Sequence, residues 1–180
     1  MDDIVQQAMV KWPNVPDCFG WLGLDTRGQW CLRDDAAQAA GAFVSGRPGA
    51  KGSVLQHEKL LGFIARNYAS DAAGRWYFQN GPQRVYVELQ CTPYIWRVDG
   101  SGGVTSHTGV QTMVRACYLD EAGWLYLDTP LGFGLVHTAD VERAAAQVEC
   151  GAWLPQEVLA AALPARFGYV TSPQSHPVDA

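Results

Sequence analysis

The chain has 180 residues, of which 48% are hydrophobic, and its seven Trp and seven Tyr make it too aromatic for a disordered chain and long enough to bury a core. The formal net charge of −5 argues against a nucleic-acid groove, which needs a clustered excess of Lys and Arg. The acidic start MDDIVQQAM does not fit a signal peptide, and no run approaches the roughly 20 apolar residues that cross a bilayer, so a cytoplasmic protein without membrane partners is expected.

The first predicted element is a short helix, Ile4–Met9. Three later segments share the pattern Asp-x-x-Gly before an apolar strand: Asp25–Gly28, Asp71–Gly74 and Asp120–Gly123. Asp suits the start of such a turn because its carboxylate accepts backbone N–H groups, and Gly suits the end, where φ is positive. We therefore expect three β-hairpin tips.

The main helix is predicted over Val54–Tyr68. Ser53 and Gln56 fit a capping box, and Leu61 and Ile64 continue an apolar stripe that begins at Val54. The stripe should pack one face of this helix on a sheet. The loop before it, SGRPGAKG, does not meet the P-loop pattern because Ala50 precedes Lys51.

Alternating residues then predict strands. The segments RWYFQ and RVYVELQ should form a hairpin through Asn80-Gly81-Pro82, and PYIWRV should continue an antiparallel meander after a break at Cys91-Thr92-Pro93. Further helices are predicted at Ala139–Glu149, after a Thr138 cap, and at Pro155–Leu163.

Strands grouped between helices, without βαβ alternation, predict the α+β class. The expected architecture is a bent antiparallel sheet or partial barrel of hairpins, packed on one main helix with short flanking helices. Residues 1–170 should form a single domain, with 1–52 as an alternative small N-terminal subdomain, and 171–180 should be a flexible tail.

One face of the predicted sheet is the candidate binding surface. Arg84, Tyr86 and Glu88 alternate onto the same side of their strand, and Trp96 of the next strand is a candidate to share it. Exposed aromatic residues beside Arg are typical of interaction hot spots. The alternative is a solvated face with cross-strand pairs, or aromatic residues covered by a helix.

Two histidines are candidates for a general base or a ligand contact. His57 lies on the apolar stripe of the main helix, and His137 lies between a strand and a helix cap; the alternative for both is a structural role. His107 lies in the loop SGGVTSHTGV, which either carries function or connects strands.

No catalytic, metal or cofactor site is predicted. A zincin motif after His57 would need a second His where Leu61 stands, and no nucleophile elbow occurs. The five cysteines, Cys18, Cys31, Cys91, Cys117 and Cys150, are dispersed without a CxxC pair, as expected of reduced thiols.

The segments Gly52–Val98 and Gly123–Val141 resemble an uncharacterised family of bacterial, chiefly proteobacterial, proteins of unknown function. The resemblance extends from about Trp12 to Val148 and implies a cytoplasmic bacterial protein. The order of a Gly-Trp hairpin, a helix and a valine-rich meander is more weakly similar to a second uncharacterised bacterial family, whose structures contain a pleckstrin-homology-like barrel.

From these patterns we expect a non-catalytic binding or regulatory module that recognises a small ligand or a protein partner through the aromatic sheet face. One alternative is a hydrolase-like or other enzyme with His57 or His137 as general base. A second alternative is a structural homodimer that pairs through its own sheet edges or aromatic faces.

Overall fold

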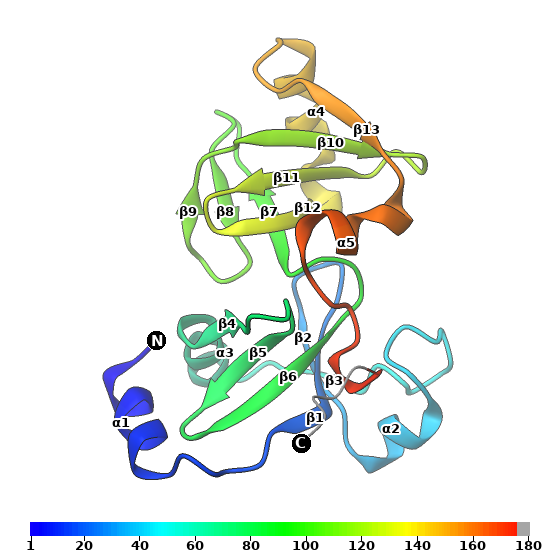
Figure 1. The fold of residues 1–180 in the computed structure, drawn as a ribbon. Helices are drawn as coiled ribbons and strands as arrows, with labels where there is room; N and C mark the ends of the chain where they lie inside the picture. The colour runs from blue at the N-terminus through cyan, green and yellow to red at the C-terminus, as the bar shows by residue number, and fades with distance from the viewer. Residues whose placement is uncertain (176–180) are drawn as a thin grey trace. The chain divides into compact units, whose positions relative to one another are not determined.

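The fold is α+β, with two open sheets and several short helices, in a computed structural model that describes residues 1–175 (Figure 1). Neither sheet closes into a barrel. The chain forms two compact units. Unit 1 contains Met1–Asp25, Gln29–Gln90 and the chain from Tyr169 onward, and unit 2 contains Thr26–Gly28 and Cys91–Gly168. Residue 52, the expected subdomain boundary, therefore lies inside unit 1.

Unit 1 holds a six-stranded sheet in the order β3-β2-β1-β6-β5-β4. Its strands are β1 (Cys18–Leu24), β2 (Trp30–Leu32), β3 (Ser53–Val54), β4 (Tyr68–Ser70), β5 (Trp76–Asn80) and β6 (Gln83–Leu89). Its helices are α1 (Asp3–Lys11), α2 (Asp35–Ala40), α3 (Glu58–Arg66) and the 3-10 helix η3 (Pro173–Ser175). β1 and β6 pair in parallel, and the other neighbours are antiparallel.

Unit 2 holds a seven-stranded sheet in the order β13-β10-β11-β12-β7-β8-β9. Its strands are β7 (Tyr94–Val98), β8 (Val104–Ser106), β9 (Gln111–Thr112), β10 (Ala116–Asp120), β11 (Leu125–Thr129), β12 (Gly132–Val136) and β13 (Pro155–Val158). Its helices are η1 (Thr138–Asp140), α4 (Val141–Glu149), η2 (Ala160–Ala162) and α5 (Leu163–Phe167). The pairs β7–β12 and β10–β13 are parallel.

Each unit has its own buried side chains. In unit 1, Leu22, Ile64 and Val87 are at most 2% exposed. In unit 2, Trp96 is fully buried, and its indole Nε1 donates a hydrogen bond of 3.1 Å to the carbonyl oxygen of Leu127. Within residues 1–175, no helix is both long and apolar enough to cross a membrane, and all five cysteines are free.

The three predicted hairpin turns are confirmed. Gly28, Gly74 and Gly123 have φ values of 73°, 77° and 80°. In each turn the Asp carboxylate accepts the backbone N–H that follows the Gly, for example from Trp124 to Asp120 at 2.8 Å. The turns connect β1 to β2, β4 to β5 and β10 to β11.

The same turn occurs at two further places that the sequence pattern did not identify. At Asp99, the carboxylate accepts the N–H of Gly103 at 2.9 Å, and Gly102 has a φ of 83°. At Ser106, the hydroxyl accepts the N–H of Val110 at 3.1 Å. These turns join β7 to β8 and β8 to β9. The Asp99 turn fits the Asp-x-x-Gly pattern but was not singled out, because only Val104 of the following strand Val104–Ser106 is apolar, and the other turn has Ser in place of Asp.

The main helix is shorter than predicted. Ser53 and Val54, expected at its start, form β3 and pair with Leu32 and Cys31 of β2. The helix begins at Glu58, because His57 is its N-cap and accepts the N–H of Leu60 through Nδ1 at 3.3 Å. Pairing with a distant strand thus overrides the local capping box.

The predicted meander is partly wrong. β5 and β6 form the expected hairpin, but β7 enters the other sheet, where it pairs with β8 and β12. The predicted helix Pro155–Leu163 is also wrong over its first half, because Pro155–Val158 pairs in parallel with β10. The predictions of α1 and α4 are confirmed, although η1 occupies the first turn expected for α4.

The start of the expected tail is held against unit 1. The carbonyl oxygen of Thr171 accepts the N–H of Leu89 at 2.7 Å, and Pro173 is buried. Residues 176–180, the rest of the expected flexible tail, lie outside the described residues.

Candidate functional site

The predicted binding face is present but is largely covered. Cross-strand pairing of Tyr77 with Tyr86 and of Gln79 with Arg84 places these four side chains on one face of unit 1. Tyr86 is fully buried, and its ring stacks on Phe19 of β1 at 4.5 Å. The expectation of an exposed aromatic face is therefore wrong at Tyr86, because β1 packs beside β6 and brings Phe19 over it.

Two other residues expected on that face are also buried. Glu88 is 4% exposed, and its carboxylate accepts the N–H of Gln174 at 3.1 Å. Trp96 is fully buried in unit 2 and belongs to a different sheet. The structure thus does not gather Arg84, Tyr86, Glu88 and Trp96 on one surface.

The Tyr86 hydroxyl belongs to a buried polar cluster. It donates to the carboxylate of Asp71 at 3.0 Å, and Arg75 donates to the same oxygen through Nε at 2.8 Å. Burial opposes ionisation of Asp71, but the hydrogen bonds from Arg75 and Tyr86 outweigh it and lower the pKa of this carboxyl. Unit 2 repeats the arrangement, with Tyr126 donating to Asp120 at 2.8 Å. Both clusters tie a turn Asp to a strand Tyr, which is a structural role.

Arg84 is the predicted site residue that lines a cavity. Its guanidinium lies 4.9 Å from the centre of the Tyr77 ring, within cation–π range. The cavity, of about 360 Å³, lies between β5–β6 and the N-terminal segment. We call it the polar pocket; its lining residues are Met9, Trp12, Pro13, Val15, Asp17, Gln79, Pro82 and Arg84.

A second cavity in unit 1, of about 420 Å³, has a mainly apolar wall. We call it the apolar pocket; its lining residues are Trp21, Leu22, Leu32, Arg33, Asp34, Leu60, Ile64, Phe78, Asn80 and Val85. Pairing of Leu22 with Leu32 and of Phe78 with Val85 builds the sheet wall, and α3 supplies Leu60 and Ile64. Sequence patterns did not identify this pocket because its lining comes from segments far apart in the chain.

The two candidate histidines serve as caps. His57 is exposed and caps α3. The Nδ1 of His137 accepts the N–H of Ala139 at 3.0 Å and so caps η1. His57 is thus neither half-buried nor on the packed stripe, because the helix starts after it. Neither histidine lines one of the pockets described here.

His107 is more enclosed than either. Its Nδ1 accepts the N–H of Ile95 at 3.3 Å, and burial lowers the pKa of the imidazole to about 3. This histidine is therefore neutral at pH 7 and joins the Ser106 turn to β7.

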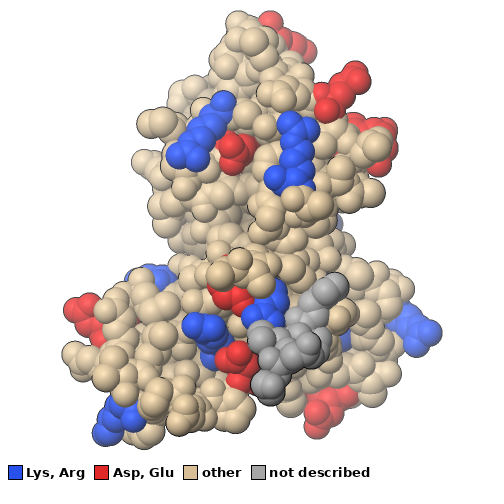
Figure 2. Space-filling view, in the orientation of Figure 1, with Lys and Arg blue, Asp and Glu red and all other residues tan. Residues whose placement is uncertain are grey.

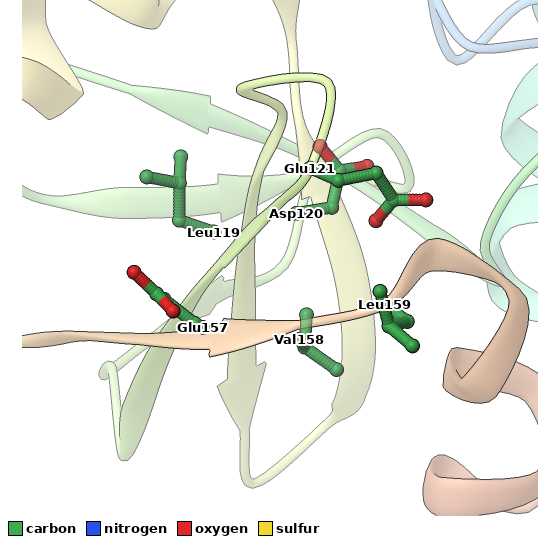
Figure 3. A pocket seen from close by; sticks show the side chains of 6 residues that line it. All are labelled: Leu119, Asp120, Glu121, Glu157, Val158 and Leu159. Atoms are coloured by element: carbon green, nitrogen blue, oxygen red, sulfur yellow. The ribbon is translucent and has the colours of Figure 1, made fainter.

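Unit 2 has an acidic cavity of about 460 Å³ (Figure 3). Asp120 uses both carboxylate oxygens within its own turn and with Tyr126, and Glu121 accepts the N–H of Ala160 at 2.9 Å. Figure 3 shows the carboxylate of Glu157 apart from these two. Within residues 1–175, no group of three or more His, Cys, Asp or Glu side chains could hold a metal ion. The cavity therefore offers no pair of free carboxylates for acid–base chemistry.

Charged groups of both signs are interspersed on the face shown in Figure 2. The thiols of half-buried Cys91 and buried Cys117 are unsuited to nucleophilic chemistry, because desolvation raises the pKa of each to about 11.

The model of a family described as "Protein of unknown function (DUF2946)" matches residues 1–174 of the chain. No curated protein matches significantly. Two similar solved structures are DUF1285 family proteins. The one from Silicibacter pomeroyi DSS-3 is 14% identical, with 80% of this chain and 83% of that chain covered and a TM-score of 0.47. The one from Shewanella baltica OS155 is 12% identical, with 71% and 92% covered and a TM-score of 0.46.

Proposed function

The chain belongs to this family of proteins of unknown function, and from its own geometry we propose that it is a non-catalytic binding module of the bacterial cytoplasm. Its ligand is a small molecule with an apolar body, held in the apolar pocket of unit 1. The observation that carries the proposal is the cavity of about 420 Å³ with its mainly aliphatic and aromatic wall. Ligand pockets of soluble proteins have this size and this lining.

The pocket is formed before any ligand arrives. Arg33 is 1% exposed and donates to the carbonyl oxygens of Ala50 at 2.8 Å and Gly20 at 3.0 Å, so the segments beside the pocket are tied together. On the α3 side, Phe63 packs edge-on against Phe78 at 5.4 Å. A ligand does not have to order a wall that is held in this way, so no binding free energy is lost in ordering it.

The exposure of Trp21 and Leu32 indicates that the cavity is a ligand site and not an ordinary packing defect in the core. Both line the pocket, and they remain 43% and 45% exposed, so apolar surface faces water there. Asp34 and Asn80, also exposed, supply polar groups in the same lining. A ligand with an apolar body and one polar end fits this distribution.

Two alternatives are less well supported. An enzyme that uses His57 or His137 as general base needs a cleft with a second convergent group, and both histidines are occupied as helix caps. A protein partner or a second copy of the chain would need a broad interface, whereas the exposed large apolar side chains that line this pocket are Trp21 and Leu32.

Native mass spectrometry of the purified protein tests the proposal first, because a retained small molecule appears as added mass. The hydrophobic dye 1-anilinonaphthalene-8-sulfonate then serves as a probe in a fluorescence titration. Leu32→Gln should weaken dye binding by about tenfold, since part of a leucine's burial energy is lost. Because Leu32 is already 45% exposed, the variant should keep its melting temperature.

The matched control is Val110→Gln in unit 2, where the valine is 46% exposed and outside the apolar pocket. It should bind the dye like the wild type. Equal dye affinity in both variants, without a retained small molecule, would contradict the proposal. Light scattering on the same samples shows whether the protein is a dimer, and a dimer that Leu32→Gln dissociates would favour the homodimer instead.

A further inference from the structure

The polar pocket contains charged groups that ion pairs within the protein do not use. Arg84 and Asp17 both line it, and their charges act on one another. Among residues 1–175, however, the ion pairs closer than 4.0 Å involve Asp2, Asp71 and Asp140, and neither Arg84 nor Asp17 takes part in one. The pocket therefore presents a guanidinium and a carboxylate that are near each other but separate.

Arg84 is held in position for recognition. Its guanidinium lies over the ring of Tyr77, 4.9 Å from the ring centre. A guanidinium has five N–H donors in a planar fork, and in residues 1–175 those of Arg84 are not used in an ion pair. Such a group binds carboxylates with fixed geometry and little loss of side-chain freedom.

Gln79 adds a buried hydrogen-bond acceptor. This residue is 1% exposed and lies directly across from Arg84 in the β5–β6 pair. Its Nε2 donates to the carbonyl oxygen of Gly81 at 2.9 Å, but its Oε1 has no hydrogen-bond partner among the described residues. A buried oxygen without a donor destabilises the fold, so it calls for a donor from outside the protein.

The remaining wall of the pocket is apolar and comes from the N-terminal segment. Met9 and Trp12 line it, and Trp12 is 51% exposed. Gln83 donates to the carbonyl oxygen of Pro16 at 3.0 Å, and Ala8 lies against the Gly81 turn, so this segment is attached to the hairpin. Figure 1 shows α1 beside the turn that joins β5 to β6.

We propose that the polar pocket binds a small zwitterion of the free amino acid type. Its carboxylate pairs with Arg84, its ammonium group donates to Asp17 and toward Gln79, and its side chain contacts Trp12 and Met9. A cavity of about 360 Å³ admits a ligand of this size. The site shares no lining residue with the apolar pocket, so the two proposals stand or fall separately.

Thermal-shift measurements with free L-amino acids at millimolar concentration, one at a time, identify the best ligand, and isothermal titration gives its affinity. The amide of that amino acid lacks the carboxylate, and its N-acetyl derivative lacks the ammonium group. Each should bind at least about tenfold more weakly, which corresponds to one charge-assisted hydrogen bond.

Arg84→Met keeps an unbranched side chain over Tyr77 but removes the charge, and it should lose binding. Asp17→Asn is the second variant, because Asp17 is exposed and its substitution should leave folding intact while weakening binding by about tenfold. Arg47→Met, at an exposed loop position, is the control and should bind like the wild type.

Failure of every amino acid to bind would overturn the proposal. Wild-type affinity in folded Arg84→Met would also overturn it, as would equal affinity for the amide or the N-acetyl derivative. Unchanged binding of the best amino acid by Leu32→Gln would support a site separate from the apolar pocket.

Discussion

Several side chains that suggested chemistry in the sequence satisfy the backbone instead. His57 and His137 each accept one N–H at the start of a helix, and Glu88 accepts the backbone N–H of Gln174. Residue type alone does not separate these roles, because a cap and a general base need the same lone pair. What distinguishes the two roles is whether a backbone N–H lies within hydrogen-bond distance of the ring nitrogen.

His107 shows the same principle and gives a pH prediction. Burial lowers the pKa of its imidazole from 6.5 to about 3, so the folded state holds it neutral while the unfolded state binds a proton below pH 6.5. The stability that the fold gains by holding His107 neutral is therefore fully present above pH 6.5. It is lost as pH falls from there toward 3. One such proton changes the free energy of unfolding by at most about 1.4 kcal/mol per pH unit.

Urea unfolding at about pH 7, 6 and 5, monitored by a signal from unit 2, measures how the free energy of unfolding changes with pH. His107→Asn should be less stable than the wild type at pH 7 and should show a flatter decline toward pH 5. His57→Asn keeps a residue that caps helices well and should retain the wild-type slope. Parallel slopes in wild type and His107→Asn would show that His107 is not the group that titrates.

At the scale of the element, the recurring turn is the most predictable feature. It depends on an Asp carboxylate, a Gly and the N–H that follows, all within one short segment, so the sequence pattern contains the whole interaction. The ends of α3 were less predictable. Ser53 has the residue type of a cap, but its pairing partner Leu32 is far away in the chain. The same holds for Pro155–Val158, which pairs with β10.

Two of these turns differ in what surrounds the Gly, which allows a matched test. Gly28 and Gly123 have similar positive φ values of 73° and 80°. A Cβ at Gly123 would meet no atom within 4 Å, whereas a Cβ at Gly28 would lie 2.9 Å from the Cβ of His107. Gly123→Ala should thus cost only the backbone strain, roughly 1–2 kcal/mol of unfolding free energy.

Gly28→Ala should cost clearly more, because the contact with His107 adds to the same strain. Chemical denaturation of the two variants under identical conditions gives the comparison. Equal losses of unfolding free energy would mean that the β1–β2 turn moves to accommodate the added Cβ without further strain. A smaller loss at Gly28 would contradict the geometry of this turn.

At the scale of the whole molecule, strand alternation identified most strands but not their partners. Period-2 patterns indicate faces, and β5–β6 followed from its short connection. The parallel pairs β1–β6, β7–β12 and β10–β13 join segments that no local signal connects. For the same reason local alternation could single out Arg84 as a candidate, whereas the apolar pocket, assembled from separate strands and a helix, could not be predicted.

Unit 1 is completed only when the chain returns to it after unit 2. Tyr169 and Pro173 are buried, Val170 donates to the carbonyl oxygen of Gly74 at 2.9 Å, and Thr171 accepts from Leu89. Removing residues 169–180 should therefore destabilise unit 1 by roughly 3–5 kcal/mol, the sum of one buried aromatic side chain and two or three hydrogen bonds.

Hydrogen exchange followed by mass spectrometry locates this loss. In the chain that ends at Gly168, peptides covering β1 and β6 should exchange faster, while those covering β10 and β11 should keep their protection, because each unit has its own buried core. A chain that ends at Ser175 retains every interaction named above and should exchange like the full chain. If β10 and β11 lose protection together with β1 and β6, the two units unfold as one, and the structural division into two units does not extend to stability.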